Sequence, residues 1–172
     1  MLRMKSNYEV RARVFAQAIY PFVCDCKSIA DFENAIEEFN ALFHRHVRVD
    51  CGQTRVVFIT SDYVLKLDYG NRGKRWGTCA DERKAYCKVV HDGYAYLFAK
   101  TTPIMVNEKV FYVMPRINRI GIQYNGWDEA YDVVNDKERD YLYDNFRDLH
   151  SENYGWKNRK PVIVDYACME VW

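Results

Sequence analysis

The sequence has no long hydrophobic run and no excess of charge of either sign. No apolar stretch approaches the roughly 20 residues that a helix needs to cross a bilayer. The formal charge is +1 at pH 7, from 25 basic and 24 acidic residues. A chain of balanced charge has no general attraction for nucleic acid or for an anionic membrane. We therefore expect neither of these as a partner.

Paired cysteines are also scarce. The six cysteines are scattered, and only Cys24 and Cys26 lie close together. A zinc site there is an alternative to ordinary reduced thiols, but no second pair or nearby histidine supports it. The N-terminus carries Arg3 and Lys5 among polar residues, so we expect no secretory signal. The sequence thus predicts a reducing compartment, the cytoplasm of the producing or infected cell.

Aromatic residues, in contrast, are plentiful. The 172 residues include 14 Tyr, 9 Phe and 4 Trp, and 49% of the chain is hydrophobic. This composition supplies enough apolar side chains for a buried core, which excludes an intrinsically disordered chain. We therefore expect one domain or one compact two-lobed unit.

Two segments within residues 1–46 have the period of a helix. The first is a short helix over residues 8–20. We expect it to end before Pro21, because proline pushes the preceding residue out of the helical region. Ser28 and Asp31 then form a capping pattern. We predict a helical extension whose apolar face packs against a sheet, with an interaction surface as the alternative. The apolar positions of that face are Ile29, Phe32, Ile36, Phe39 and Phe43.

From Val47 the hydrophobic period changes to that of β-strands. Five β-rich runs follow, separated by turn residues at Gly52, at 61–62 and at 107–108. With a helix starting after Thr78, this pattern predicts an α+β fold with a five-stranded antiparallel sheet. The runs cover residues 47–50, 55–59, 63–67, 103–106 and 109–114.

One charged residue interrupts the third of these runs. Lys66 lies between Leu65 and Leu67, and on an edge strand it would be an ordinary exposed lysine. The other interpretation is a lysine that faces a cleft and needs an anionic partner. Glu82 can supply that partner, because helical spacing puts it on one apolar face with Ala85. We predict that Lys66 and Glu82 form an ion pair.

Three polar residues farther along the chain have the spacing of a metal and phosphate site. Asn153 follows Asp148 by five residues, and Asp165 ends the short apolar run 161–164. Carboxylate and amide oxygens suit Mg²⁺, and a further carboxylate can orient an attacking hydroxyl. We therefore expect Asp148, Asn153 and Asp165 to converge on one cleft that faces Lys66.

The order of these residues resembles the motifs of the protein-kinase superfamily. Asp148, Leu149 and Asn153 match its D-L-x-x-x-N loop, and Val64-Leu65-Lys66 resembles its strand-borne lysine. The resemblance implies Mg²⁺, ATP, and transfer of the ATP γ-phosphate to a protein or small-molecule hydroxyl. It implies catalysis by Asp148, Lys66 and Glu82, nucleotide contacts from Lys66, Gly52, Thr54 and Met114, and metal ligation by Asn153 and Asp165.

The resemblance also implies how the chain is divided. Residues 47–115 correspond to the small lobe, and residues 116–172 correspond to an abbreviated second lobe. Met114-Pro115-Arg116 would be the hinge between them. Because seven residues follow Asp165 in the sequence, we expect no activation segment and no peptide-binding helices.

Details of the motifs point to a particular branch of the superfamily. Asp148-Leu149-His150, followed by Asn153, resembles the D-L-H-x-x-N of aminoglycoside and choline phosphotransferases and of compact bacterial and phage kinase-like proteins. Asp165-Tyr166-Ala167 replaces D-F-G, and Phe146 stands where protein kinases have the His of H-R-D. The turn at 51–54 holds one glycine in place of three, which makes close approach to phosphate harder.

Three interpretations remain open from the sequence. The first is a minimal kinase-like phosphotransferase. The second is a kinase-like pseudoenzyme or inhibitor that acts by binding a partner protein. The third is an unrelated α+β domain whose acidic residues lie on the surface. Binding of ATP and Mg²⁺ separates the first from the third, and phosphate transfer separates the first from the second.

Overall fold

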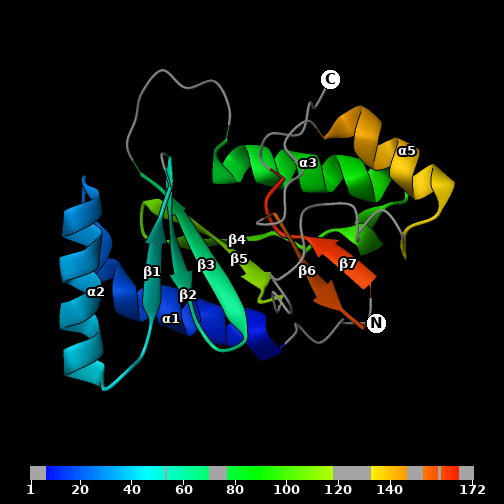
Figure 1. The fold of residues 1–172 in the computed structure, drawn as a ribbon. Coiled ribbons are helices and arrows are strands. Elements are labelled where there is room, and N and C mark those ends of the chain that lie inside the picture. The colour runs from blue at the N-terminus through cyan, green and yellow to red at the C-terminus, as the bar shows by residue number, and fades with distance from the viewer. Residues whose placement is uncertain are drawn as a thin grey trace, which may run out of the picture. The chain divides into compact units, whose positions relative to one another are not determined.

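A computed structural model describes residues 7–52, 54–69, 77–117, 133–146, 153–158 and 160–166 (Figure 1). The chain has the mixed helix and strand content of an α+β protein, as predicted. Its elements are α1 (Asn7–Val23), α2 (Ile29–Phe43), β1 (Arg48–Cys51), β2 (Arg55–Ile59), β3 (Tyr63–Asp68), α3 (Cys79–His91), the 3₁₀ helix η1 (Ala95–Leu97), β4 (Thr102–Val106), β5 (Lys109–Pro115), α5 (Asp136–Asn145), β6 (Tyr154–Lys157) and β7 (Lys160–Ile163).

The chain divides into two compact units. Unit 1 comprises Met1–Lys74 and Thr102–Arg116, and unit 2 comprises Arg75–Thr101 and Ile117–Trp172. Unit 1 therefore joins the N-terminal helices to the sheet, and unit 2 joins α3 to the C-terminal elements. The kinase resemblance implies a different division, based on functional roles, into residues 1–46, 47–115 and 116–172. That division stays a prediction. Unit 1 ends at Arg116, the last residue of the predicted hinge.

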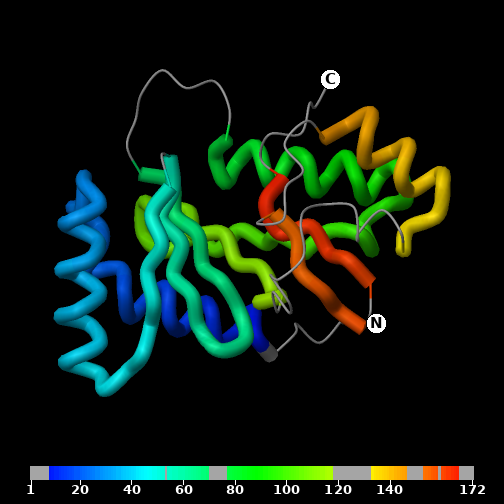
Figure 2. The backbone as a smooth tube through the Cα atoms, viewed as in Figure 1, coloured from blue at the N-terminus to red at the C-terminus, as the bar shows by residue number. Residues whose placement is uncertain are grey.

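Unit 1 contains the predicted five-stranded antiparallel sheet. Its strand order is β1-β2-β3-β5-β4, and every neighbouring pair is antiparallel. The tube in Figure 2 follows the chain through the meander of β1, β2 and β3. The β4–β5 hairpin turns at Asn107, whose φ of 49° lies in the left-handed region that asparagine tolerates. This hairpin places β5 directly beside β3.

Helices α1 and α2 of unit 1 pack against the sheet (Figure 1). Side chains alternate between the two faces of a strand, so Leu65 and Leu67 of β3 join Phe58 of β2 in the core. Aromatic rings fill the space between helices and sheet, and the ring centroids of Phe15 and Phe39 are 5.6 Å apart. The second face of β3 carries Lys66.

Two details of the helical extension differ from expectation. Helix α1 continues through Pro21 to Val23, because burial of Val23 in the core outweighs the loss of the hydrogen bond that Pro21 cannot donate. The capping box of Ser28 and Asp31 is confirmed at the start of α2. Phe32, Ile36 and Phe39 are buried, whereas Ile29 and Phe43 at the helix ends are 45% and 47% exposed. The packing face is therefore shorter than the apolar pattern.

Unit 2 is built from α3, η1, α5 and the β6–β7 hairpin. A capping box of Thr78 and Asp81 begins α3, as the sequence predicts. A parallel bridge pairs Phe98 with Ile163 of β7, and the Ala99 N–H donates to the Ile163 carbonyl at 2.8 Å. The Phe98 ring stacks on that of Phe146 at 5.0 Å. These contacts join the segment after α3 to the end of α5 and to the C-terminal hairpin.

Candidate functional site

Lys66 lies on a central strand, not on an edge. Strand β3 is the third of five, and Lys66 is opposite Val57 on one side and Tyr112 on the other. Its side chain is 5% exposed. Lysine is among the residues least often buried, because its ammonium group needs compensation for lost water. The interpretation of Lys66 as an exposed edge-strand lysine is therefore wrong.

Glu82 lies on the buried face of α3. It is 0% exposed, and Cys79, Ala85 and Val89 are buried with it at helical spacing. Its carboxylate also raises the pKa of Tyr166, after the larger effect of burial. Lys66 belongs to unit 1 and Glu82 to unit 2, so an ion pair between them would join the two units and stays a prediction.

The two predicted metal ligands flank the β6–β7 hairpin. The Asn153 carbonyl accepts hydrogen bonds from the Val164 N–H at 2.8 Å and from the Asp165 N–H at 3.3 Å. The hairpin register brings this about, because Tyr154 pairs with Ile163. Asn153 is 7% exposed and Asp165 is half-buried. The structure thus brings Asn153 and Asp165 together at the backbone.

The chemistry of these two residues fits a magnesium ion. An amide oxygen from Asn153 and a carboxylate from Asp165 are hard oxygen donors, and Mg²⁺ prefers such ligands over nitrogen and sulfur. Within the described ranges, no group of three or more His, Cys, Asp or Glu side chains could hold a metal ion. Asp148, the predicted catalytic base, lies outside the described residues.

The predicted nucleotide-binding residues occupy the β1–β2 turn and β5. Gly52 donates its N–H to the Arg55 carbonyl at 2.9 Å, and its own carbonyl accepts the Tyr69 hydroxyl at 2.7 Å. The Thr54 carbonyl accepts the Tyr69 N–H at 3.0 Å. A Cβ atom at Gly52 would meet the Arg55 oxygen at 3.6 Å, which is ordinary contact. Packing within the protein therefore does not require glycine in this turn.

Met114 and its neighbours form the end of the sheet. Met114 is buried and lies opposite Val64 of β3. Arg116, two residues on, donates its backbone N–H to the Asp62 carbonyl at 3.0 Å and its Nη1 to the Thr60 carbonyl at 2.8 Å. The predicted hinge is thus tied to the β2–β3 turn at its last residue.

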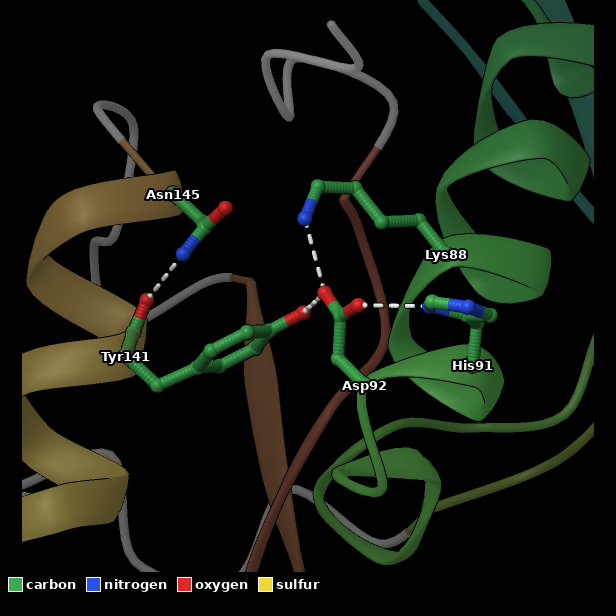
Figure 3. Close-up of polar contacts among 5 residues, drawn as sticks. All are labelled: Lys88, His91, Asp92, Tyr141 and Asn145. Atoms are coloured by element: carbon green, nitrogen blue, oxygen red, sulfur yellow. Dashed lines mark hydrogen bonds and ion pairs between the residues drawn. The ribbon is translucent and has the colours of Figure 1, made fainter.

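A polar cluster at the C-terminal end of α3 was not predicted from the sequence. Figure 3 shows the Asp92 carboxylate between α3 and α5. Asp92 Oδ2 accepts hydrogen bonds from Lys88 Nζ at 2.7 Å and from the Tyr141 hydroxyl at 2.8 Å, and Oδ1 lies 3.1 Å from His91 Nδ1. These bonds, led by that of Lys88, lower the pKa of Asp92 to about 2. Burial and the bond to Asp92 raise the pKa of Tyr141.

A second tyrosine–carboxylate bond supports the same helix. The Tyr96 hydroxyl donates to Glu138 Oε1 at 2.6 Å, and burial together with this bond raises the pKa of Tyr96 to about 12. The ring of Tyr94 stacks on that of Tyr141 at 3.9 Å. The spacing of Lys88 and Asp92 was the one available sequence signal, because i and i+4 meet on a helix. The tyrosine partners come from distant positions, so no local pattern indicates them.

None of the described helices has the length and apolar character needed to cross a bilayer. This agrees with the absence of a long hydrophobic run in the sequence.

The comparisons with known proteins give no family for this chain. No protein-family model matches it, and no curated protein and no solved structure matches it either. Function must therefore be argued from the placement and chemistry of individual residues.

Proposed function

We propose that the protein is a minimal kinase-like phosphotransferase that moves the γ-phosphate of ATP to a hydroxyl of a protein or small molecule. The observation that carries this proposal is a pair of buried charged side chains. Lys66 is 5% exposed on the third strand of the sheet, and Glu82 is 0% exposed on the helix that follows it. Burying an ionised group is costly, so a fold retains one where a partner or a ligand compensates it.

The placement of these two residues supports the kinase-like interpretation. In protein kinases the phosphate-binding lysine is on the third strand of the small lobe, and its glutamate partner is on the following helix. The same order of strand, helix and residue types occurs here. Lys66 lies in a five-stranded antiparallel sheet, as in the small lobe that the resemblance implies. Of the predicted hinge residues, Met114 lies on β5 and Arg116 ends unit 1.

The remaining roles fall on the C-terminal residues. Asp148 would take the proton of the acceptor hydroxyl, whose oxygen then forms a bond to the γ-phosphorus. The bond from that phosphorus to the β–γ bridging oxygen breaks, and ADP leaves. Asn153 and Asp165 would hold Mg²⁺, which when bound neutralises charge on the phosphates.

A second candidate function is a kinase-like module that binds a partner protein without catalysis. The β1–β2 turn favours it, because protein kinases use glycines to bring the backbone of this turn close to the phosphates. Here Gly52 has a conformation that a side chain tolerates, and its carbonyl accepts a hydrogen bond from the Tyr69 hydroxyl. The turn therefore makes its contacts within the protein, and it lacks the glycines that would bring its backbone close to a phosphate.

Thermal stability with ATP and Mg²⁺, measured together with transfer of labelled γ-phosphate, tests the proposal. The wild type should gain stability from ATP with Mg²⁺. The Asp165→Ala variant should lose both stabilisation and transfer, and Asp148→Ala should lose transfer alone. Asp144→Ala on the exposed side of α5 is the matched control. If ATP with Mg²⁺ leaves the wild type unchanged and both variants keep the protein's biological effect, the binding module is correct.

A further inference from the structure

The residue after Asp165 makes two buried hydrogen bonds through its side chain. Tyr166 is 1% exposed, and its hydroxyl donates to the Ala99 carbonyl at 2.5 Å. The same oxygen lies 2.6 Å from Thr101 Oγ1. A phenol has one proton and a carbonyl can only accept, so Thr101 donates the second bond. The hydroxyl of Tyr166 is therefore fully engaged, with one bond given and one received.

The ring of Tyr166 is fixed as well. It meets the ring of Phe98 edge to face at 5.3 Å, and it lies 6.5 Å from the ring of Tyr86 on α3. Burial, with the nearby charge of Glu82, raises the pKa of Tyr166 well above its usual value.

The backbone before Tyr166 is held by the residue that precedes β6. The N–H groups of Val164 and Asp165 both donate to the Asn153 carbonyl. Asp165 therefore sits between two anchors, the hairpin backbone on one side and the Tyr166 side chain on the other. A main-chain segment fixed at both ends keeps few alternative conformations, so the Asp165 carboxylate is presented from a defined position.

We propose that Tyr166 is a positioning residue for Asp165, and that its hydroxyl holds the Asp165 segment in place for a divalent cation. The inference rests on the proposed function for the identity of the ligand, but the holding of the segment is independent of it. In a kinase-like motif with phenylalanine at this position the hydroxyl bonds would be missing. Tyrosine adds a hydrogen bond to the Ala99 carbonyl. Ala99 is in turn joined to β7, because its N–H donates to the Ile163 carbonyl.

Amide hydrogen exchange of the intact chain tests whether Tyr166 holds the segment. Tyr166→Phe keeps the ring and removes the hydroxyl, so exchange at the Val164 and Asp165 amides should become about five- to tenfold faster. The matched control is Tyr141→Phe, which removes a tyrosine hydroxyl bond at Asp92 in the same unit. Equal rates at these two amides in both variants would overturn the inference. Thr101→Val removes the second bond and should give a smaller effect in the same direction.

Titration with Mn²⁺ in the presence of ATP, followed by the paramagnetic signal of the ion, tests the consequence for metal binding. Loss of a supporting contact behind a metal ligand typically weakens affinity by about tenfold or more. We expect this loss in Tyr166→Phe and an unchanged affinity in Tyr141→Phe. Unchanged affinity in Tyr166→Phe would overturn the inference and leave the proposed function intact. A wild type without affinity would overturn the proposed function and the metal claim, while amide exchange still decides the role of Tyr166 in holding Asp165.

Discussion

The two units differ in what fills their interiors. Within the described part of the chain, five polar or charged residues are buried, and four of them belong to unit 2. These four are Glu82, Thr101, Glu138 and Asn153. The core of unit 1 is a cluster of aliphatic and aromatic side chains, and its one buried charged residue, Lys66, lies on the second face of β3.

This difference separates two ways of holding a fold. Hydrophobic packing has no preferred direction and tolerates small displacements, whereas hydrogen bonds weaken steeply away from good geometry. Unit 1 is thus suited to be a stable support. Unit 2 fixes the positions of particular groups, and the predicted metal ligands Asn153 and Asp165 belong to it. Three experiments sharpen this comparison.

The largest effect should come from the core of unit 1. Phe58 is fully buried and contacts the rings of Phe15 and Phe32 at 6.5 Å. The Phe58→Ala variant should lose about 3–5 kcal/mol of unfolding free energy, since a cavity remains where the ring was. Chemical denaturation measures this loss, which should not change between pH 5 and 8. Val14→Ala, at a site that is 61% exposed on α1, should cost less than about 0.5 kcal/mol.

A smaller effect is expected for the coupling of the two buried charges. If Lys66 and Glu82 pair, Lys66→Met and Glu82→Gln should each be destabilising, and the double variant should cost less than their sum. A coupling of about 2 kcal/mol would be in the range for residues in contact. The measurement is a double-mutant cycle by chemical denaturation. Strict additivity would show that each charge is compensated within its own unit.

The smallest effect concerns the Asp92 cluster of unit 2 and depends on pH. The pKa of Asp92 is lowered to about 2 from its usual value of 3.8, so folding favours the charged form. This stability is fully present above about pH 4 and is lost as pH falls toward 2. Asp92→Asn should therefore cost about 1 kcal/mol at pH 7, with allowance for partial exposure. The cost should shrink between pH 4 and 2.

Denaturation curves of the wild type and of Asp92→Asn, measured from pH 7 to pH 2, check this prediction. Asp144→Asn is the control, because Asp144 lies on α5 in the same unit and its side chain is exposed. A difference in unfolding free energy between wild type and Asp92→Asn that stays constant from pH 7 to 2 would contradict the prediction.

The sequence predicted well where short-range rules apply. The capping boxes at Ser28 and Thr78 were recognised because their partner residues are three positions apart. The strands were found from alternation and turn residues, and the inward position of Glu82 came from helical spacing. Each of these features depends on a few neighbouring residues, so a single sequence contains the information.

Features that depend on distant partners were missed. The Tyr141 hydroxyl meets Asp92 across 49 positions, and the Tyr96 hydroxyl meets Glu138 across 42. No local period indicates which tyrosine will find which carboxylate. The passage of α1 through Pro21 has a similar cause, because tertiary burial of Val23 outweighs the local preference to stop. Asp148 lies outside the described residues, so its role stays a prediction.

The bond between Thr101 and Tyr166 has a consequence for the order in which the protein is made. Unit 1 has all its residues once Arg116 has been synthesised, so it can fold while the chain is still growing. Unit 2 cannot fold at that stage, because Thr101 bonds to the hydroxyl of Tyr166, which is 65 positions later in the sequence. Until then, Glu82 and the rest of the buried face of α3 lack the C-terminal half of their unit. Translation should therefore yield a folded unit 1 first, with α3 as the segment most in need of protection from association.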